Sequence, residues 1–223
     1  SIPDTSIPPV TAGGPVQDIR TAELAEEVRS KGWIAYSARG DNGTWDLFVS
    51  RPDGSDKKNI TNTPDYEEAA PRFTTDGSRM LFRRMAKGAV INHDLWGFQG
   101  ELMTAGGNGA NAEPFGGDGE YAWASWSPDG SQILCLTKKD IEIVDAATKE
   151  VAHSLPRQGI YQQLFWSPNG KWFTGTANHA GTEWCVVRMN VETGEVNPIV
   201  TFQSCTADWF PDSAHIIFSS RPA

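Results

Sequence analysis

The chain has 223 residues and a mass of 24.4 kDa, enough for one large domain or two small ones with a sizeable core. It contains 19 basic and 28 acidic residues, which gives a formal net charge of −9 and a pI near 4.9. This balance argues against nucleic acid or an anionic membrane surface as the main partner, because both need a basic protein face. Charged residues make up 21% and hydrophobic residues 39%, so the chain is not of the disordered class.

Residues 1–30 differ in composition from the rest, and we expect them to form a tether followed by a short helix. The segment 1–15 carries four prolines and two glycines, which suits an extended linker. Such a tether often joins a membrane anchor to an extracytoplasmic domain; a disordered terminus is the alternative. No run approaches 18 apolar residues, so the sequence predicts no membrane-spanning helix.

The segment 18–31 predicts a helix. Leu24 and Val28 lie four residues apart, and three glutamates, at 23, 26 and 27, precede two basic residues at the end, as the helix dipole favours. Gly32 ends the pattern. We expect this helix to pack on the following domain or on a partner.

A repeat extends through most of the remaining chain. Each copy has an aromatic residue, a polar turn and an apolar strand. The equivalent turn residues are Asp76, Asp129, Asn169 and Asp212, at spacings of 53, 40 and 43. Proline presets the first turn position, Asp or Asn bonds its own backbone, and glycine accepts a positive φ, so each turn joins two strands in a hairpin. A period of about 40 to 50 residues built from strands alone is typical of β-propeller blades.

Two more strands follow each hairpin and complete a unit of four. The third strands are expected at 45–49, 94–98, 141–144 and 184–189, and the closing strands at 58–61, 151–155 and 196–201. The connector 106–119 holds so many glycines that we expect a mobile flap there. The sequence therefore predicts an all-β fold, a β-propeller of four-stranded antiparallel blades with four to five repeats visible, after an N-terminal extension and short helix.

The segment 45–77 resembles one full period of the TolB-type WD-like propeller repeat. It contains in order a Trp–Asp–Leu–Phe strand, a Pro–Asp–Gly turn, an Asn–Ile–Thr strand end and a Phe–Thr–Thr–Asp–Gly turn. Residues 126–130 match the hallmark Trp–Ser–Pro–Asp–Gly in full, and residues 166–170 depart from it only in Asn169. The resemblance covers residues 31–223 and implies a TolB-like β-propeller there; the N-terminal α/β domain of TolB has no counterpart.

The strand count leaves the closure of the propeller open. The segment 33–36 reads as the second strand of a first blade that lacks its first strand, and the last repeat has only the strands 206–210 and 216–219. The strand 206–210 could complete the first blade and close a four-bladed ring, which would leave 216–219 with an open edge. Alternatively the blades belong to a larger propeller, since TolB-like propellers usually have six or more, or a partner strand caps the edge.

The three cysteines, Cys135, Cys185 and Cys205, contain no Cys–x–x–Cys pair, so neither a zinc knuckle nor a redox motif is expected. Cys185 and Cys205 could form a disulfide, which would indicate an oxidising compartment. The alternative is three partly buried thiols that act as small hydrophobic residues.

Irregular segments are expected on the face opposite the Asp–Gly turns, where length variation carries binding in such scaffolds. The most basic of them, 83–93, could grip a carboxylate or a phosphate group. Three tyrosines recur just before the first strand of a blade, at the mouth of the central channel, although repeat packing also explains them. The predicted partner-binding residues are Tyr66, Arg83, Arg84, His93, Tyr121, Tyr161 and His179.

One aromatic position recurs three residues before each turn acid or amide. It is occupied by Phe73, Trp126, Trp166 and Trp209. We interpret these side chains as core between blades rather than as a binding surface.

Catalysis has little support in the sequence, and we expect no catalytic, cofactor or metal residue. No Gly–x–Ser–x–Gly elbow is present, so the similarity to peptidases with propeller domains stops before their hydrolase half. The four histidines occupy separate places without a metal-binding spacing. The alternative is a carbohydrate-binding or lyase- or hydrolase-type propeller similar to pectate-fragment lyases, with His93 and His179 meeting near a metal or an acidic sugar.

The resemblance implies a non-catalytic scaffold that mediates protein–protein interaction in the bacterial cell envelope, as a subunit of a larger assembly. The location implied is periplasmic or otherwise extracytoplasmic, and the partners implied are proteins, including those of a membrane-associated complex, with no nucleic acid.

Overall fold

A computed structural model of the protein describes residues 19–90, 97–179 and 181–220. The chain divides into two compact units. One comprises Ser1–Ile34 with Ser50–Lys57, and the other comprises Ala35–Val49 with Lys58–Ala223. The larger unit holds the sheets, and the smaller one holds the helix.

The described residues form five sheets, which we number as blades in chain order. The first blade has three strands and the fifth has two, while the second, third and fourth have four antiparallel strands each. The strands are β1 (Ile34–Arg39), β2 (Trp45–Ser50) and β3 (Lys58–Asn59); β4 (Tyr66–Phe73), β5 (Arg79–Ala86), β6 (Glu101–Gly106) and β7 (Glu113–Pro114); β8 (Ala122–Trp126), β9 (Gln132–Leu136), β10 (Asp140–Asp145) and β11 (Val151–Pro156); β12 (Ile160–Trp166), β13 (Trp172–His179), β14 (Thr182–Asn190) and β15 (Val196–Pro198); β16 (Ser204–Trp209) and β17 (Ile216–Ser220).

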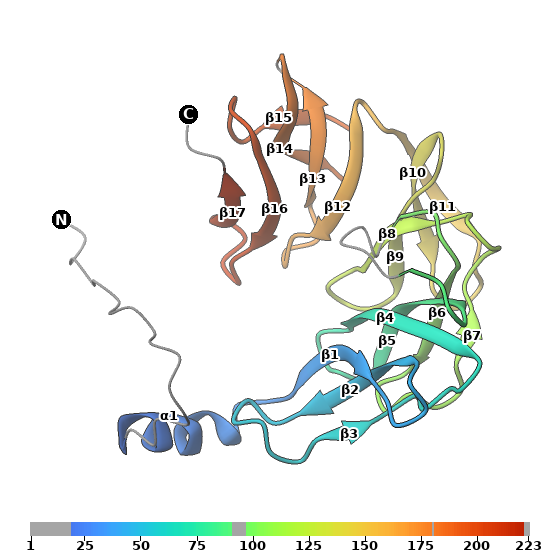
Figure 1. Ribbon diagram of the computed structural model, residues 1–223. Helices are drawn as coiled ribbons and strands as arrows, with labels where there is room; N and C mark the ends of the chain where they lie inside the picture. The colour runs from blue at the N-terminus through green and yellow to red at the C-terminus, as the bar shows by residue number, and fades with distance from the viewer. Residues whose placement is uncertain (1–18, 91–96, 180, 221–223) are drawn as a thin grey trace. The chain divides into compact units, whose positions relative to one another are not determined.

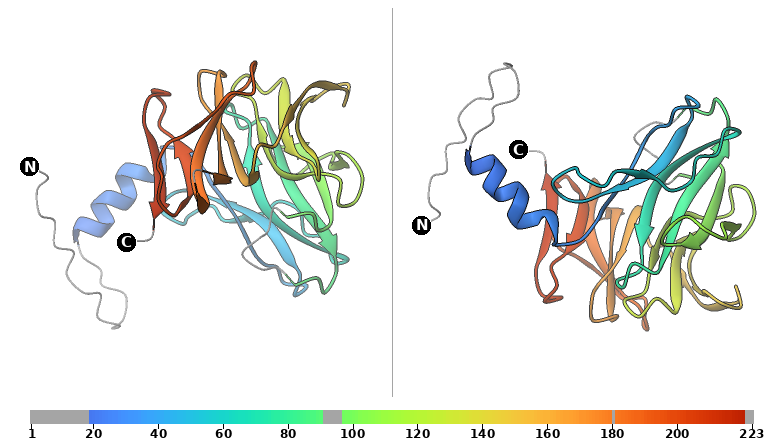
Figure 2. Two further views of the ribbon diagram at one scale, coloured as in Figure 1. Left: turned by 90° about the horizontal axis from the view of Figure 1, so that it is seen from above. Right: turned by 90° about the horizontal axis from the view of Figure 1, so that it is seen from below.

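Successive blades pack through their first strands. β4 contacts β8, β8 contacts β12, and β12 contacts β16. The sheets of this unit follow one another in chain order in Figure 1, and the two further views in Figure 2 show that they are twisted. This is the arrangement of a β-propeller, and it confirms the all-β fold with four to five repeats and one short helix.

The fifth blade bears on how the propeller closes. β16 pairs with β17, with Trp209 opposite Ile216, and among the described residues it shares no sheet with the strands of the first blade. The four-bladed ring that would use the segment 206–210 as the first strand of the first blade stays a prediction. Among the described residues, β17 lies at the edge of its sheet.

The turn that recurs in the sequence keeps two hydrogen bonds in all four repeats: one backbone bond that closes the turn, and one from the N–H two residues later to the turn acid or amide. In the third blade, the Ser127 N–H donates to Gln132 O at 2.9 Å, and Asp129 Oδ1 accepts from Ser127 Oγ at 2.6 Å and from the Ser131 N–H at 3.0 Å. These bonds hold the pKa of Asp129 at about 2, and similar bonds hold the pKa values of Asp76 and Asp212 at about 2.

The turn carboxylates predict how the fold responds to acid. Because their pKa is lower in the folded chain than in the unfolded chain, their stabilisation is complete above about pH 4 and is lost as the pH falls towards 2. We expect the melting temperature, followed by circular dichroism, to fall across this range. In a variant with Asp76→Asn, Asp129→Asn and Asp212→Asn the melting temperature should fall less steeply with pH, since asparagine already occupies the equivalent turn position at residue 169. Parallel curves of melting temperature against pH for the two proteins would contradict this.

Each first strand of the second to fifth blades contains a bulge at the same place, six residues before the turn acid or amide. The bulge residues Ala70, Trp123, Gln163 and Thr206 have φ values of 58°, 41°, 64° and 54°. The ladder to the second strand shifts register at each of them. A left-handed conformation costs a non-glycine residue roughly 1 kcal/mol or more, so its fourfold recurrence marks a feature of the fold that redirects the strand.

The second blade corrects two expectations. Its third strand is β6 and not the segment 94–98, of which 94–96 lie outside the described residues. The glycine-rich connector contains β7 and the fully buried Phe115, so the expected flap is a packed segment. A side chain at Gly109 would collide with the carbonyl of Ile60, which explains glycine there by close packing rather than by mobility.

The apolar core of the larger unit lies mainly within and between the second, third and fourth blades. Cys135 and Cys185 are fully buried in it, and Cys205 is half-buried. Cys185 and Cys205 remain thiols in the structure, in agreement with the alternative in which cysteines act as small hydrophobic residues.

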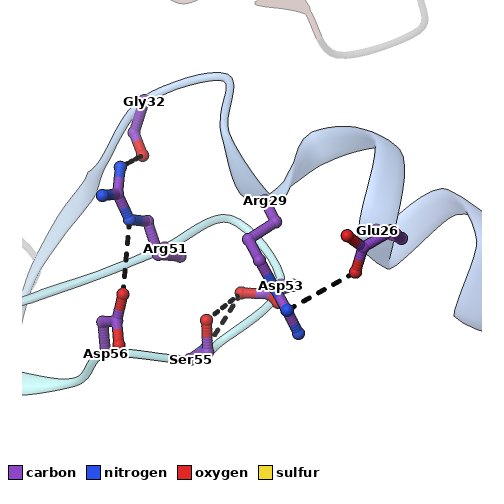
Figure 3. Close-up of polar contacts among 7 residues, drawn as sticks. All are labelled: Glu26, Arg29, Gly32, Arg51, Asp53, Ser55 and Asp56. Carbon is purple, nitrogen blue, oxygen red and sulfur yellow. Dashed lines mark hydrogen bonds and ion pairs between the residues drawn. The ribbon is translucent and has the colours of Figure 1, made fainter.

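The smaller unit holds α1 (Ile19–Arg29) against the turn 50–57, as Figure 3 shows. The predicted helix start, Asp18, lies outside the described residues. Arg29 Nε lies 2.6 Å from Asp53 Oδ2, and Asp53 Oδ1 accepts from the Ser55 hydroxyl and N–H. Ser55 and then Arg29 hold the pKa of Asp53 well below its usual value. No helix among the described residues is long and apolar enough to cross a membrane.

Candidate functional site

Two of the predicted partner-binding residues meet at one end of the second blade. Tyr66 begins β4 and its side chain is 42% exposed. The Arg84 guanidinium lies over its ring, 4.8 Å from the centroid. Arg84 Nε and Nη2 both donate to Glu68 Oε1, at 2.8 and 2.6 Å, and Glu68 is fully buried directly opposite Arg84 in the ladder. The buried carboxylate therefore fixes the guanidinium over the exposed ring.

A pocket of about 410 Å³ lies beside this pair, and we call it the Tyr66 pocket. Its wall combines Tyr66 and Arg84 with apolar side chains, including Met85, and with the carboxylates Glu101 and Asp118. Because Glu68 neutralises Arg84, the pocket has an acidic balance. The expected grip on a carboxylate or phosphate group therefore finds no available guanidinium among the described residues of the pocket wall.

Arg83 and Tyr121 meet inside the protein instead. Arg83 lies in β5 and is fully buried, so its expected place in a surface loop is wrong. Arg83 Nη1 donates to Tyr121 O at 2.7 Å, and Nη2 donates to Gly100 O at 2.9 Å and to Gln99 O. Burial lowers the pKa of Arg83 to about 10. This arginine joins the loop before β6 to the start of the third blade.

Tyr121 is 7% exposed, and its ring centroid lies 6.0 Å from that of Phe115. Burial raises the pKa of its phenol well above the usual range. It therefore belongs to the core, as the repeat-packing alternative for the tyrosines predicts, and it is not a surface contact.

The remaining predicted residues are spread over the chain. Tyr161 is half-buried near the start of β12, and burial raises its pKa. His93 lies outside the described residues. His179 ends β13 opposite Thr182, and only its backbone is described. The meeting of His93 and His179 therefore stays a prediction.

Sequence reasoning missed Arg72, which reaches across three blades. Its Nη1 donates to Ala124 O at 3.0 Å and to Leu164 O at 3.2 Å, the carbonyls directly after the bulges of the third and fourth blades. Its guanidinium lies 4.4 Å from the centroid of the Phe165 ring. Burial lowers the pKa of Arg72 to about 10, and Asp208 opposes this shift. The available signal was an arginine at a repeat position that elsewhere holds Ser125, Phe165 and Asp208.

The side chains at the recurrent aromatic position line a hollow of about 600 Å³ at the Asp–Gly turns, which we call the turn-face hollow. Trp126 Nε1 donates to Arg72 O at 3.2 Å and Trp209 Nε1 donates to Phe165 O at 3.1 Å, which confirms that these two tryptophans join blades. Trp166 and Trp209 are half-buried and line the hollow together with Pro128, Pro168 and Pro211. Their role as core therefore leaves part of these rings open to a ligand.

The described residues contain no group of three or more His, Cys, Asp or Glu side chains that could hold a metal ion. The alternative with His93 and His179 is not tested by this observation, because the side chains of both residues lie outside the description.

Comparison with solved structures shows the fold. TolB from Acinetobacter baumannii superimposes with a TM-score of 0.70 at 20% identity, over 95% of this chain and 55% of that one. A putative TolB from Agrobacterium tumefaciens superimposes with a TM-score of 0.59 at 14% identity, over 83% of this chain and 69% of that one. An oligogalacturonate lyase in complex with manganese superimposes with a TM-score of 0.54 at 18% identity, over 79% of this chain and 50% of that one. The chain thus spans about half the length of the first and third of these proteins. No protein-family model and no curated protein matches the sequence.

Proposed function

We propose that this chain, whose fold is that of TolB-type β-propellers, is a non-catalytic module that binds a protein partner in the bacterial cell envelope as part of a larger assembly. The observation that carries the proposal is the Tyr66–Arg84 pair. An exposed aromatic ring lies under a guanidinium that a buried carboxylate already holds in place. Tyr and Arg are the residues that most often dominate protein interfaces, and a fixed side chain loses little entropy on binding.

The acidic Tyr66 pocket also suggests the nature of the partner surface. Glu101 and Asp118 line it beside apolar atoms, and the whole chain carries a net charge of −9. We infer that the partner presents a basic or neutral patch with an apolar centre, since complementary charge steers association and excludes acidic surfaces.

The proposed location is the periplasm or another extracytoplasmic space. The similarity to TolB-type propellers and the proline-rich composition of residues 1–15, which suits a tether, support this location. In this arrangement the N-terminal region links the propeller to a membrane-associated complex.

A Tyr66→Ala variant tests the proposed surface. We expect it to fold normally, because Tyr66 is exposed and lies outside the apolar core, and to retain less than a tenth of the partner in co-purification from the source cells. Arg188→Ala provides the matched control, since Arg188 lies 4.4 Å from the ring centroid of Trp172 in the fourth blade, outside the Tyr66 pocket. Equal recovery of partner with Tyr66→Ala and with the wild-type chain would contradict this surface.

A further inference from the structure

The turn-face hollow contains a break in the repeat. Trp126 and Trp209 each donate their indole N–H to a carbonyl of the preceding blade, on Arg72 and Phe165. By the same pattern, Trp166 would donate its indole N–H to the carbonyl of Ser125 in the preceding blade. Instead, Trp166 Nε1 donates to Gly170 O in its own turn at 3.0 Å. The indole at the seam of the third and fourth blades is thus turned away from the position that the other two occupy.

Ser125, at the same seam, has a polar group that the fold does not use. It lines the hollow and is 7% exposed, and its Oγ is buried with no hydrogen-bond partner among the described residues. Its neighbour Ser127 differs, because its Oγ donates to Asp129 Oδ1 at 2.6 Å and accepts from the Gln132 N–H at 2.9 Å. A buried hydroxyl without a partner destabilises a fold, so its presence beside a hollow indicates a ligand.

The walls of the hollow restrict the class of that ligand. Aromatic rings and three prolines supply most of the surface. The other hydroxyls are already engaged: Ser127 Oγ donates within its own turn, and Thr75 Oγ1 donates to Pro128 O of the neighbouring turn at 3.1 Å. A sugar would leave most of its hydroxyls without partners here, whereas a bulky apolar side chain needs only burial.

We infer that the turn-face hollow binds an extended peptide segment, which inserts an aromatic side chain between Trp166 and Trp209 and offers a backbone carbonyl to Ser125 Oγ. A volume of about 600 Å³ accommodates one such side chain with its neighbouring backbone. Ser125 and Trp166, the indole outside the repeat pattern, line the hollow together, so one peptide segment can contact both. The hollow lies at the Phe73 end of β4 and Tyr66 lies at the other end, so this inference does not rest on the proposed function.

Titration of the full chain with acetyl-Pro-Trp-Pro-amide tests the inference, with the Trp166 indole N–H signal followed by NMR. We expect this signal to shift with the peptide and not with acetyl-Ala-Ala-Ala-amide or maltotriose. Ser125→Ala should weaken binding about 3- to 10-fold, the effect of one neutral hydrogen bond, without lowering the melting temperature, because the hydroxyl has no partner to lose.

Ser127→Ala is the matched control from the same wall. It should lower the melting temperature, because two hydrogen bonds within the turn are lost, and should leave peptide affinity within about twofold. Unchanged affinity in Ser125→Ala, binding of maltotriose in place of the peptide, or no binding of either probe would each overturn the inference.

Discussion

An Arg84→Met variant is expected to lose about 3–5 kcal/mol of the free energy of unfolding, the cost of leaving a buried charge without its partner. Glu68 is fully buried, and its Oε1 accepts both hydrogen bonds from Arg84, while Oε2 has no partner among the described residues. Removal of the guanidinium therefore leaves the carboxylate with nothing to offset its desolvation. Urea unfolding of both proteins measures the difference.

The double variant Glu68→Met/Arg84→Met separates the charge from the packing. Two apolar side chains of similar volume should restore stability to within about 1 kcal/mol of the wild-type chain, since a buried ion pair contributes little over an apolar pair. A loss below about 1 kcal/mol in Arg84→Met, or a double variant no more stable than the single one, would show that the ion pair does not fix this end of the blade.

The second large effect is expected at Arg83, where Arg83→Met should cost about 3 kcal/mol. Its guanidinium serves the carbonyls of Tyr121, Gln99 and Gly100, and an unsatisfied buried carbonyl costs about 1–3 kcal/mol. Relief from burying a charge offsets part of the loss. Arg83→Lys should not recover this stability, because a single ammonium group cannot donate at once to Tyr121 O and to the carbonyls of Gln99 and Gly100 as the planar guanidinium does.

Urea unfolding of Arg83→Met, Arg83→Lys and Arg188→Met tests this role. Arg188 is half-buried over the ring of Trp172, so its replacement should cost less than about 1 kcal/mol. Equal stability of Arg83→Met and Arg188→Met would contradict the role of Arg83 as a link between blades.

The turns were predictable from the sequence because their bonds are local. The Asp129 carboxylate contacts residues within two positions of itself, so the residue types alone specify the hairpin and its period. The same holds for the resemblance to the TolB-type repeat, which is carried by these turns, and the solved structures with that fold agree with it.

The bulges were not predictable, because Ala70, Trp123, Gln163 and Thr206 share no residue type. Their conformation is imposed by the packing of neighbouring first strands, as when Gln163 Oε1 accepts from the Thr206 N–H of the next blade at 2.6 Å. A contact between residues 43 positions apart leaves no local signal in the sequence.

The site was predictable only in part for the same reason. Tyr66 and Arg84 lie near the ends of the paired strands β4 and β5, and their side chains are in contact across the pair. Arg83 and Arg84 look alike in sequence, but adjacent residues of a strand point to opposite faces, so one is buried and the other reaches the pocket. The sequence pattern did not reveal where β5 ends, and this placed both arginines in a loop.

A native mass spectrum of the protein isolated from its source cells tests directly whether the propeller binds a protein partner. We predict a stoichiometric complex with a protein partner, which persists in the Arg188→Ala variant and is lost in Tyr66→Ala. A lone chain that carries a divalent metal or a sugar would contradict the role as a protein-binding module and would favour a propeller of the lyase or carbohydrate-binding type.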